Sequence, residues 1–122
     1  DEIKSGAFDD GTSGTVTDVQ SSASNPITNI SILLNIGSTL EAGEKTETRY
    51  YVKGTVKSAP DTYGNFMLAD ADGNEIKVYG INGYSSLGTK PVKGDTVILC
   101  GPIYNYQGTT LELYYVDIIK II

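Results

Sequence analysis

Residues 49–80 read RYYVKGTVKSAPDTYGNFMLADADGNEIKVYG, and this stretch decides the fold. Inward and outward positions alternate strictly over residues 50–57, which predicts a half-buried strand with one wet face. Two shorter strands follow, one after a loop with Pro and Gly and one after an Asp-Gly turn. Their inward positions are Phe66, Leu68, Ile76 and Val78. The stretch therefore predicts three consecutive antiparallel strands.

The C-terminal third supplies two more strands. Thr96 to Ile103 is a strongly apolar strand, residues 104–108 form a hairpin loop, and a last strand runs from Thr109 to about Ile119. A long crossover, residues 81–95, joins the two groups of strands. Only closure hides both apolar phases of strands as short as these. The sequence therefore predicts a mainly β protein built on a five-stranded Greek-key barrel of the OB type.

One α-helix is predicted before the barrel, over Thr28–Ala42. Its apolar residues fall close to one face, Thr28 or Asn29 is placed to cap it, and Gly43 is placed to end it in a left-handed conformation. Gly37 weakens the prediction because glycine disfavours a helix interior. We expect this helix to pack against the barrel as a lid for one open end of the core.

Residues 1–25 are rich in Gly, Ser, Thr and Asp and have almost no apolar periodicity. This composition predicts a flexible acidic linker or tether, with residues 26–122 forming the helix and the barrel. A flexible acidic lead that begins at Asp1 resembles a trimmed mature product, so we expect export. The longest apolar run is far shorter than a bilayer requires, and no transmembrane segment is predicted.

Charge is spread unevenly along the 122 residues, whose net charge is −6. Residues 1–48 carry eight acids and two bases, a net charge of −6, and the remainder carries seven of each sign. The barrel therefore has no strong field of either sign. Double-stranded DNA is a poor fit, because its affinity rests largely on neutralised phosphates.

Three pieces of the chain resemble the oligonucleotide/oligosaccharide-binding fold, or OB-fold: YYVKGTV, YGNFMLADADGNEIKVYG and VKGDTVILCGPIYNYQGTTLEL. The resemblance covers about residues 26–122. This region is similar to OB-like domains in secreted proteins and predicted lipoproteins of Gram-negative gut anaerobes. Those domains begin with a proline, an amphipathic helix and the motif YVKGxV, as Pro26 to Val56 does here. The resemblance implies a binding module for single-stranded nucleic acid. It also implies a periplasmic or cell-surface location, with a lipid anchor on a preceding segment.

Barrels of this class bind ligands across strands 2 and 3, between the first-to-second and fourth-to-fifth strand loops. The candidate ligand-binding residues at these positions are Lys53, Lys57, Tyr63, Asn65, Met67, Lys77, Tyr79, Tyr84, Tyr104 and Tyr106. Tyrosines can stack on the bases of a single strand while lysines contact its phosphate backbone, and the same residue types also suit sugars. Strand packing by tyrosine and a solvated lysine face are the open alternatives.

No catalytic constellation is found in the sequence. The absence of histidine excludes the common zinc sites and histidine-based triads, and Cys100 is read as a small buried hydrophobe. Asp70 to Glu75 is read as a plain turn, with calcium as the weaker alternative. We therefore expect a non-enzymatic module without cofactor or metal. Its partner is single-stranded nucleic acid or, as the alternative, an oligosaccharide or a protein bound by an accessory domain.

Overall fold

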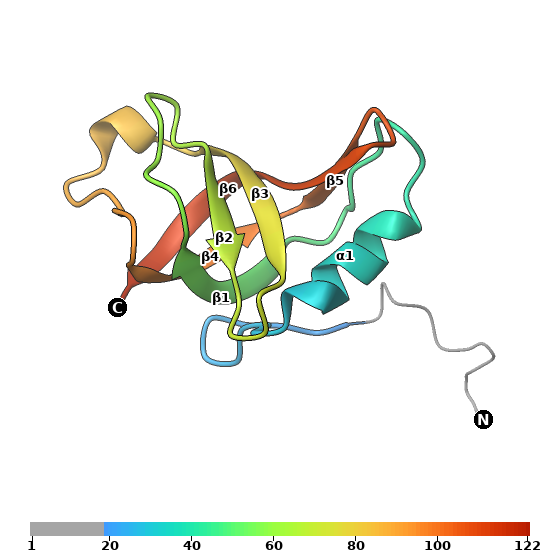
Figure 1. Cartoon of the computed structure of the whole chain (residues 1–122), viewed down its shortest axis with the longest axis horizontal. Coiled ribbons are helices and arrows are strands. Elements are labelled where there is room, and N and C mark those ends of the chain that lie inside the picture. The colour runs from blue at the N-terminus through green and yellow to red at the C-terminus, as the bar shows by residue number, and fades with distance from the viewer. Residues whose placement is uncertain (1–18) are drawn as a thin grey trace.

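The computed structural model describes residues 19–122, so most of the linker predicted over residues 1–25 lies outside the described residues. Residues 19–25 lie beside the first strand (Figure 1). Val19 packs against the core, and Ser21 Oγ accepts a hydrogen bond from the backbone N–H of Tyr51 at 2.9 Å. Ile27 then pairs in parallel with Val52, which brings the chain to the start of the helix.

Five strands close into a barrel, as the sequence predicted. In the described part of the chain, the sheet has six strands in all: β1 (Tyr50–Val56), β2 (Phe66–Ala69), β3 (Glu75–Ile81), β4 (Thr96–Gly101), β5 (Ile103–Tyr106) and β6 (Thr110–Ile121). The barrel consists of all of them except β5. The order β3-β2-β1-β4-β6 is closed by a parallel pairing of β6 with β3, and β5 continues the sheet as a hairpin with β6. Closure leaves no free edge on the barrel itself, which is the usual solution for short strands. The architecture is compatible with an OB-like fold.

The predicted strand from Thr96 to Ile103 is two strands rather than one. Pro102 has no backbone N–H to donate to a sheet, and it separates β4 from β5. The loop predicted at residues 104–108 is therefore mostly strand β5. Residues 107–109 make the turn, and Gln107 and Gly108 both have a positive φ, as a tight hairpin requires.

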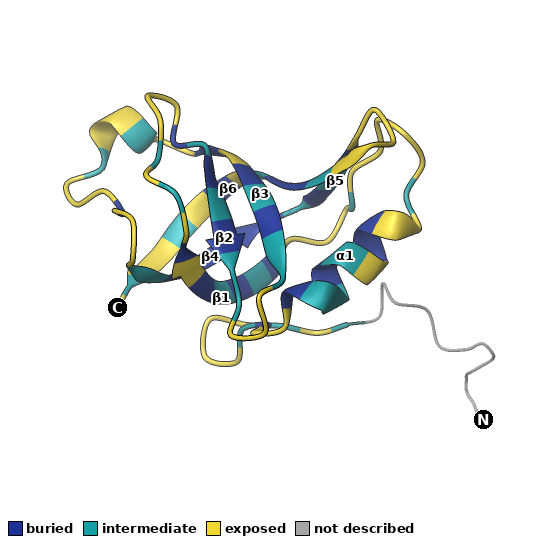
Figure 2. Cartoon of the chain, viewed as in Figure 1, coloured by how far each residue is buried: buried dark blue, intermediate teal, exposed yellow. Residues whose placement is uncertain are grey.

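The core follows the alternation read from the sequence. β1 alternates between buried and less buried residues along its length, and Figure 2 shows the bands on the ribbon. The four inward positions predicted on β2 and β3, which are Phe66, Leu68, Ile76 and Val78, are all buried. Cys100 is buried on β4, as expected.

The helix α1 (Ile30–Ser38) is shorter than predicted. Asn29 caps it, since its side-chain oxygen accepts the N–H of Ser31 at 3.0 Å. It ends at Ser38 because the hydroxyls of Ser38 and Thr39 bond to the carbonyls of residues 35 and 36, which competes with another helical turn. Gly43 does adopt a left-handed conformation, but in a separate turn beyond the helix. Within the described residues, no helix is long and apolar enough to cross a membrane.

Gly37 explains how the helix lies so close to the sheet. It is buried, and a Cβ atom there would lie 2.9 Å from Leu111 and 3.1 Å from Ile103. The glycine that weakens helix propensity therefore permits a close approach to β5 and β6. With Ile30, Leu33 and Ile36 it forms the buried face of the helix.

The Asp70–Glu75 turn ties the helix to the barrel. One oxygen of the Asp70 carboxylate accepts the N–H of Ile30 at 2.8 Å, at the start of α1. The same carboxylate accepts hydrogen bonds from Asp72 and from the backbone and side chain of Asn74. Its oxygens are thus engaged within the protein, and residues 19–122 contain no cluster of three or more acidic or thiol side chains suited to a metal.

Candidate functional site

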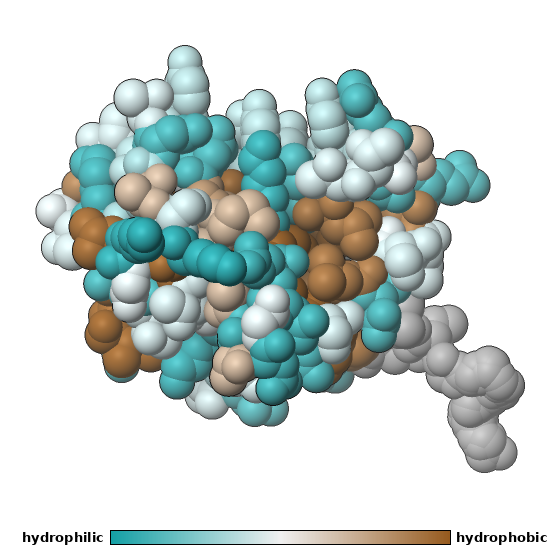
Figure 3. Space-filling view, in the orientation of Figure 1, coloured by the Kyte–Doolittle hydropathy of each residue, from teal (hydrophilic) through white to brown (hydrophobic). Residues whose placement is uncertain are grey.

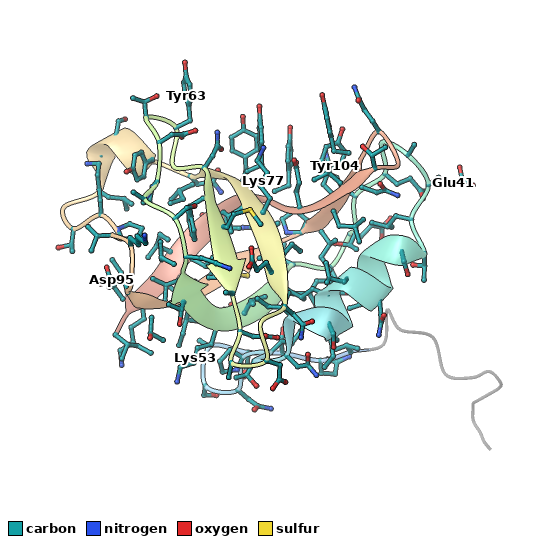
Figure 4. The ribbon with its side chains drawn as sticks, viewed as in Figure 1. Glu41, Lys53, Tyr63, Lys77, Asp95 and Tyr104 are labelled. Atoms are coloured by element: carbon teal, nitrogen blue, oxygen red, sulfur yellow. The ribbon has the colours of Figure 1, made fainter. Side chains whose placement is uncertain are left out.

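Seven of the nine tyrosines line two adjoining pockets on one side of the barrel. These residues, which we call the tyrosine face, are Tyr63, Tyr79, Tyr84, Tyr104, Tyr106, Tyr114 and Tyr115. In Figure 4 the labelled side chains of Tyr63, Lys77 and Tyr104 project in one direction, whereas Lys53 lies on the opposite side. The side chains projecting along that upper edge in Figure 3 are pale or teal rather than brown, as expected for tyrosine and lysine.

Five of the rings touch one another in sequence across β5, β6 and β3. Tyr106 lies 6.1 Å from Tyr104 between ring centroids, and Tyr104 lies 4.7 Å from Tyr114. Tyr114 stacks on Tyr79 at 5.6 Å, and Tyr115 meets both of these rings edge-on. Such contacts stabilise aromatic pairs by about 0.5–1.5 kcal/mol beyond area burial. The rings are therefore held as one surface.

Tyr114 and Tyr115 are neighbours in sequence and yet both contact Tyr79, although strand alternation places neighbours on opposite faces. Tyr115 has a φ of 47°, a left-handed conformation that is uncommon for a bulky residue. Gly80 lies across from it on β3 with a φ of 86°. A Cβ on Gly80 would lie 2.8 Å from the Tyr115 ring. The glycine thus makes room for the second ring.

Loops place the remaining two rings. Asp61 accepts hydrogen bonds from the backbone N–H groups of Tyr63 and Asn65 at 2.9 and 3.0 Å, which orders the β1–β2 loop beneath Tyr63. The bond from the backbone of Asn65, followed by that from Tyr63, lowers the pKa of Asp61. Tyr84 begins the short 3₁₀ helix η2 (Tyr84–Ser86) in the crossover after β3.

The two pockets meet at Tyr79, which lines both. The larger has a volume of about 580 Å³ and lies between the β1–β2 loop, the end of β3 and η2. The smaller has a volume of about 220 Å³ and lies over β3, β5 and β6. Four rings of the face remain substantially exposed, Tyr63 most of all at 75%. Exposed aromatic surface beside pockets is typical of binding sites.

Lysines lie over these rings. The Lys77 ammonium is 5.5 Å from the centroid of Tyr79, and that of Lys90 is 5.4 Å from Tyr84. Lys45 lies 5.2 Å from Tyr114. In the part of the chain that the structure describes, every cation–π contact found involves a ring of the tyrosine face. The face therefore interleaves aromatic and basic groups.

Glu112 is the acidic member of the smaller pocket. Its side chain points to the same side of the sheet as its cross-strand partners Lys77 on β3 and Tyr104 on β5. Only 3% of the residue is exposed. Burial raises the pKa of the Glu112 carboxyl, and the nearby Lys77 charge offsets part of that rise. Burial, followed by the neighbouring tyrosines and Glu112, also raises the pKa of the Tyr114 hydroxyl.

The structure brings together seven of the ten candidate residues read from the sequence. These seven line the two pockets: Tyr63, Asn65, Lys77, Tyr79, Tyr84, Tyr104 and Tyr106. Met67 lies on the same side as Lys77, its cross-strand partner, but lines neither pocket. Lys57 forms an ion pair with Glu75, and Lys53 lines a shallow hollow beside Asp70 on the other side of the barrel. Neither lysine belongs to the tyrosine face.

Five aromatic or charged residues of the site were not among the sequence candidates, namely Lys45, Lys90, Glu112, Tyr114 and Tyr115. Alternation along the last strand would have indicated Tyr114 and Glu112, because Leu113 between them faces the core. Alternation could not have indicated Tyr115, because its position depends on a positive φ that the sequence does not predict.

No family model matches this chain, and a search of curated proteins gave no match either. The fold and the geometry of the tyrosine face therefore carry the functional argument.

Proposed function

We propose that this domain is a non-catalytic binding module that holds single-stranded nucleic acid on the tyrosine face. The observation that supports the proposal is the gathering of seven of nine tyrosines around two adjoining pockets, with three lysines over four of the rings. Proteins that bind single strands combine aromatic rings, on which bases stack, with positive charges that follow the backbone. The OB-like barrel presents both on the side between its β1–β2 and β5–β6 loops.

The charge of the face is modest but has the required sign. Lys45, Lys77 and Lys90 supply three positive charges beside the rings, and Glu112 supplies one negative charge whose ionisation burial disfavours. Single strands need fewer phosphate contacts than duplexes when stacking contributes, since each stacked base is worth about 1–3 kcal/mol. The acidic character of the chain as a whole comes from residues 1–48 rather than from this face.

The test is a titration with fluorescently labelled oligothymidine of about ten nucleotides, a length within the range that one such barrel covers. We expect binding at low salt, with an affinity that falls linearly with the logarithm of salt concentration. The Lys45→Ala variant should reduce that slope by about 0.7, the value for one phosphate contact to a single strand. Lys53→Ala is the matched control and should leave the slope unchanged, because Lys53 lies on the other side. Absence of binding at low salt would refute the proposal.

An oligosaccharide is the second candidate ligand, and the larger pocket favours it. Within residues 19–122, no charged side chain lines that pocket, which is built from tyrosines, small polar residues, glycines and Ile81. Sugar rings are neutral and carry hydroxyl groups, so they can stack on the tyrosines and form hydrogen bonds with the polar residues of this lining. Affinity for a sugar oligomer would respond little to salt, so the same salt series separates the two ligands.

The sequence resemblance to domains of exported proteins and lipoproteins of gut anaerobes supports a finer proposal. We infer that the domain works outside the cytoplasm, in the periplasm or at the cell surface. Fractionation of cells that express the full-length gene product, with detection in periplasm, membrane and cytosol, tests this inference. Recovery in the cytosol alone would contradict it.

A further inference from the structure

Glu112 is the one charged residue that is buried within residues 19–122. It lines the smaller pocket together with four tyrosines and Lys77. A buried carboxylate is costly unless hydrogen bonds or an opposite charge compensate it. The contacts around Glu112 therefore indicate which kind of ligand the pocket can bind.

The carboxylate has no hydrogen-bond or salt-bridge partner among the described residues. Lys77 is its cross-strand neighbour, yet the ammonium lies over the Tyr79 ring, 5.5 Å from its centroid. The Glu112 carboxylate, a hydrogen-bond acceptor, and the Lys77 ammonium, a donor, thus lie side by side in a pocket lined by aromatic rings. Both groups can form hydrogen bonds to a ligand. Such an arrangement selects a planar ring with hydrogen-bond donors next to an acceptor.

Among the bases, guanine fits this pattern best. Its N1–H and N2–H₂ groups form two adjacent donors that match the two oxygens of one carboxylate, and its O6 acceptor lies beside them. Thymine offers a single N–H between two carbonyl oxygens, which would face the carboxylate. Adenine and cytosine each direct only one amino group to it.

We propose that the smaller pocket is a guanine subsite, in which Glu112 accepts from N1–H and N2–H₂ while Lys77 donates to O6 and the flanking tyrosines stack on the base. This inference rests on the proposed function, single-strand binding by the tyrosine face. It adds a base preference that stacking alone does not give, since stacking tolerates every base.

The test compares oligothymidine of about ten nucleotides with the same oligomer carrying one central deoxyguanosine, deoxyinosine or deoxyadenosine. We expect the guanosine oligomer to bind about tenfold more tightly than oligothymidine, as a bidentate pair gives that order of discrimination. Inosine lacks the N2 amino group and should lose most of the gain. Equal affinity for the guanosine, inosine and thymidine oligomers would overturn the inference.

Variants assign the preference to the carboxylate. Glu112→Gln presents an amide donor to the guanine donors, so it should abolish the guanosine preference, measured as the ratio of guanosine-oligomer to oligothymidine affinity for the same variant. Glu41→Gln is the matched control. Glu41 is exposed, its carboxylate bonds to nothing in the described part of the chain, and the variant makes the same change of charge. Retention of the guanosine preference in Glu112→Gln would overturn the assignment.

The two levels of the proposal fail in different ways. If oligothymidine binds with the expected salt dependence but guanosine adds nothing, the subsite is wrong and the single-strand function stands. If no oligomer binds at low salt, the proposed function fails and the subsite fails with it.

Discussion

Tyr79 is the residue on which the tyrosine face depends most, because its ring lines both pockets and contacts Tyr114 and Tyr115. We predict that Tyr79→Ala weakens single-strand binding by about 1–3 kcal/mol, the value of one stacked base. Tyr51→Ala is the control, since Tyr51 lies outside both pockets. Fluorescence titration of the three proteins measures the difference, and equal losses in the two variants would contradict a specific role for Tyr79.

The raised pKa of Glu112 leads to a separate prediction about the stability of the fold. Burial raises the pKa of its carboxyl, so the folded protein binds this proton more tightly than the unfolded chain does. The free energy of unfolding therefore falls as pH rises from the unfolded pKa through the folded one. Because burial disfavours ionisation of this carboxyl, Glu112→Gln should increase the free energy of unfolding at neutral pH by roughly 1 kcal/mol. Below about pH 4, where the carboxyl is protonated in both states, the gain should vanish.

Denaturant unfolding of the wild type and of Glu112→Gln at both pH values checks this prediction. A stability gain that persists unchanged at low pH would show that ionisation is not its cause. A gain at neutral pH combined with a lost guanosine preference would show that the carboxylate is kept for binding and not for folding.

At the scale of elements, the pairing of β3 with β6 depends on Gly80. We predict that Gly80→Ala destabilises the domain by about 2–4 kcal/mol, because it adds a contact with the Tyr115 ring to the strain of a positive φ. Gly73→Ala is the matched control for Gly80→Ala. Gly73 has nearly the same φ but open space around it, so that variant should cost only about 1–2 kcal/mol. Chemical denaturation measures both, and equal losses would mean that the Tyr115 contact is unimportant.

The start of α1 depends on the Asp70–Glu75 turn. Desolvation opposes ionisation of Asp70, but hydrogen bonds from Asn74, Ile30 and Asp72 prevail and lower its pKa. Its contribution to stability is therefore present above the unfolded pKa, about 4, and is lost as pH falls through the lowered value. We predict that Asp70→Ala costs about 1–2 kcal/mol at neutral pH, as loss of a helix cap does.

The control for Asp70→Ala is Asp72→Ala, because the exposed Asp72 carboxylate accepts no hydrogen bond from residues 19–122. Thermal or urea unfolding between about pH 3 and pH 7 compares the two. The difference between Asp70→Ala and the wild type should shrink at the acidic end. A difference that does not depend on pH would contradict a role for the ionised carboxylate.

Sequence periodicity predicted the strands well and their breaks poorly. Alternation is a local property, so β1 and the inward positions of β2 and β3 could be read directly. The ends of α1 and β4 depend on other interactions. Hydroxyls of Ser38 and Thr39 end the helix early, and Pro102 divides an apolar run that periodicity alone reads as continuous.

At the scale of the whole molecule, the sequence predicted the closed five-stranded barrel and most of the tyrosine face. Tyr63 in the β1–β2 loop and Tyr104 and Tyr106 on β5 were visible as candidates in the sequence. The sequence did not reveal Tyr115, whose left-handed backbone breaks alternation, or Lys45, which reaches the face from a loop before β1. Both depend on tertiary packing between segments far apart in the chain.

The most direct test of the tyrosine face is a map of backbone amide chemical shifts on titration with oligothymidine at low salt. We predict that the shifts gather on β3, on the first half of β6 and in the loops that carry Tyr63 and Tyr84. The β1 surface around Lys53 should remain unchanged. Shifts centred on Lys53, or no shifts at all, would contradict the account.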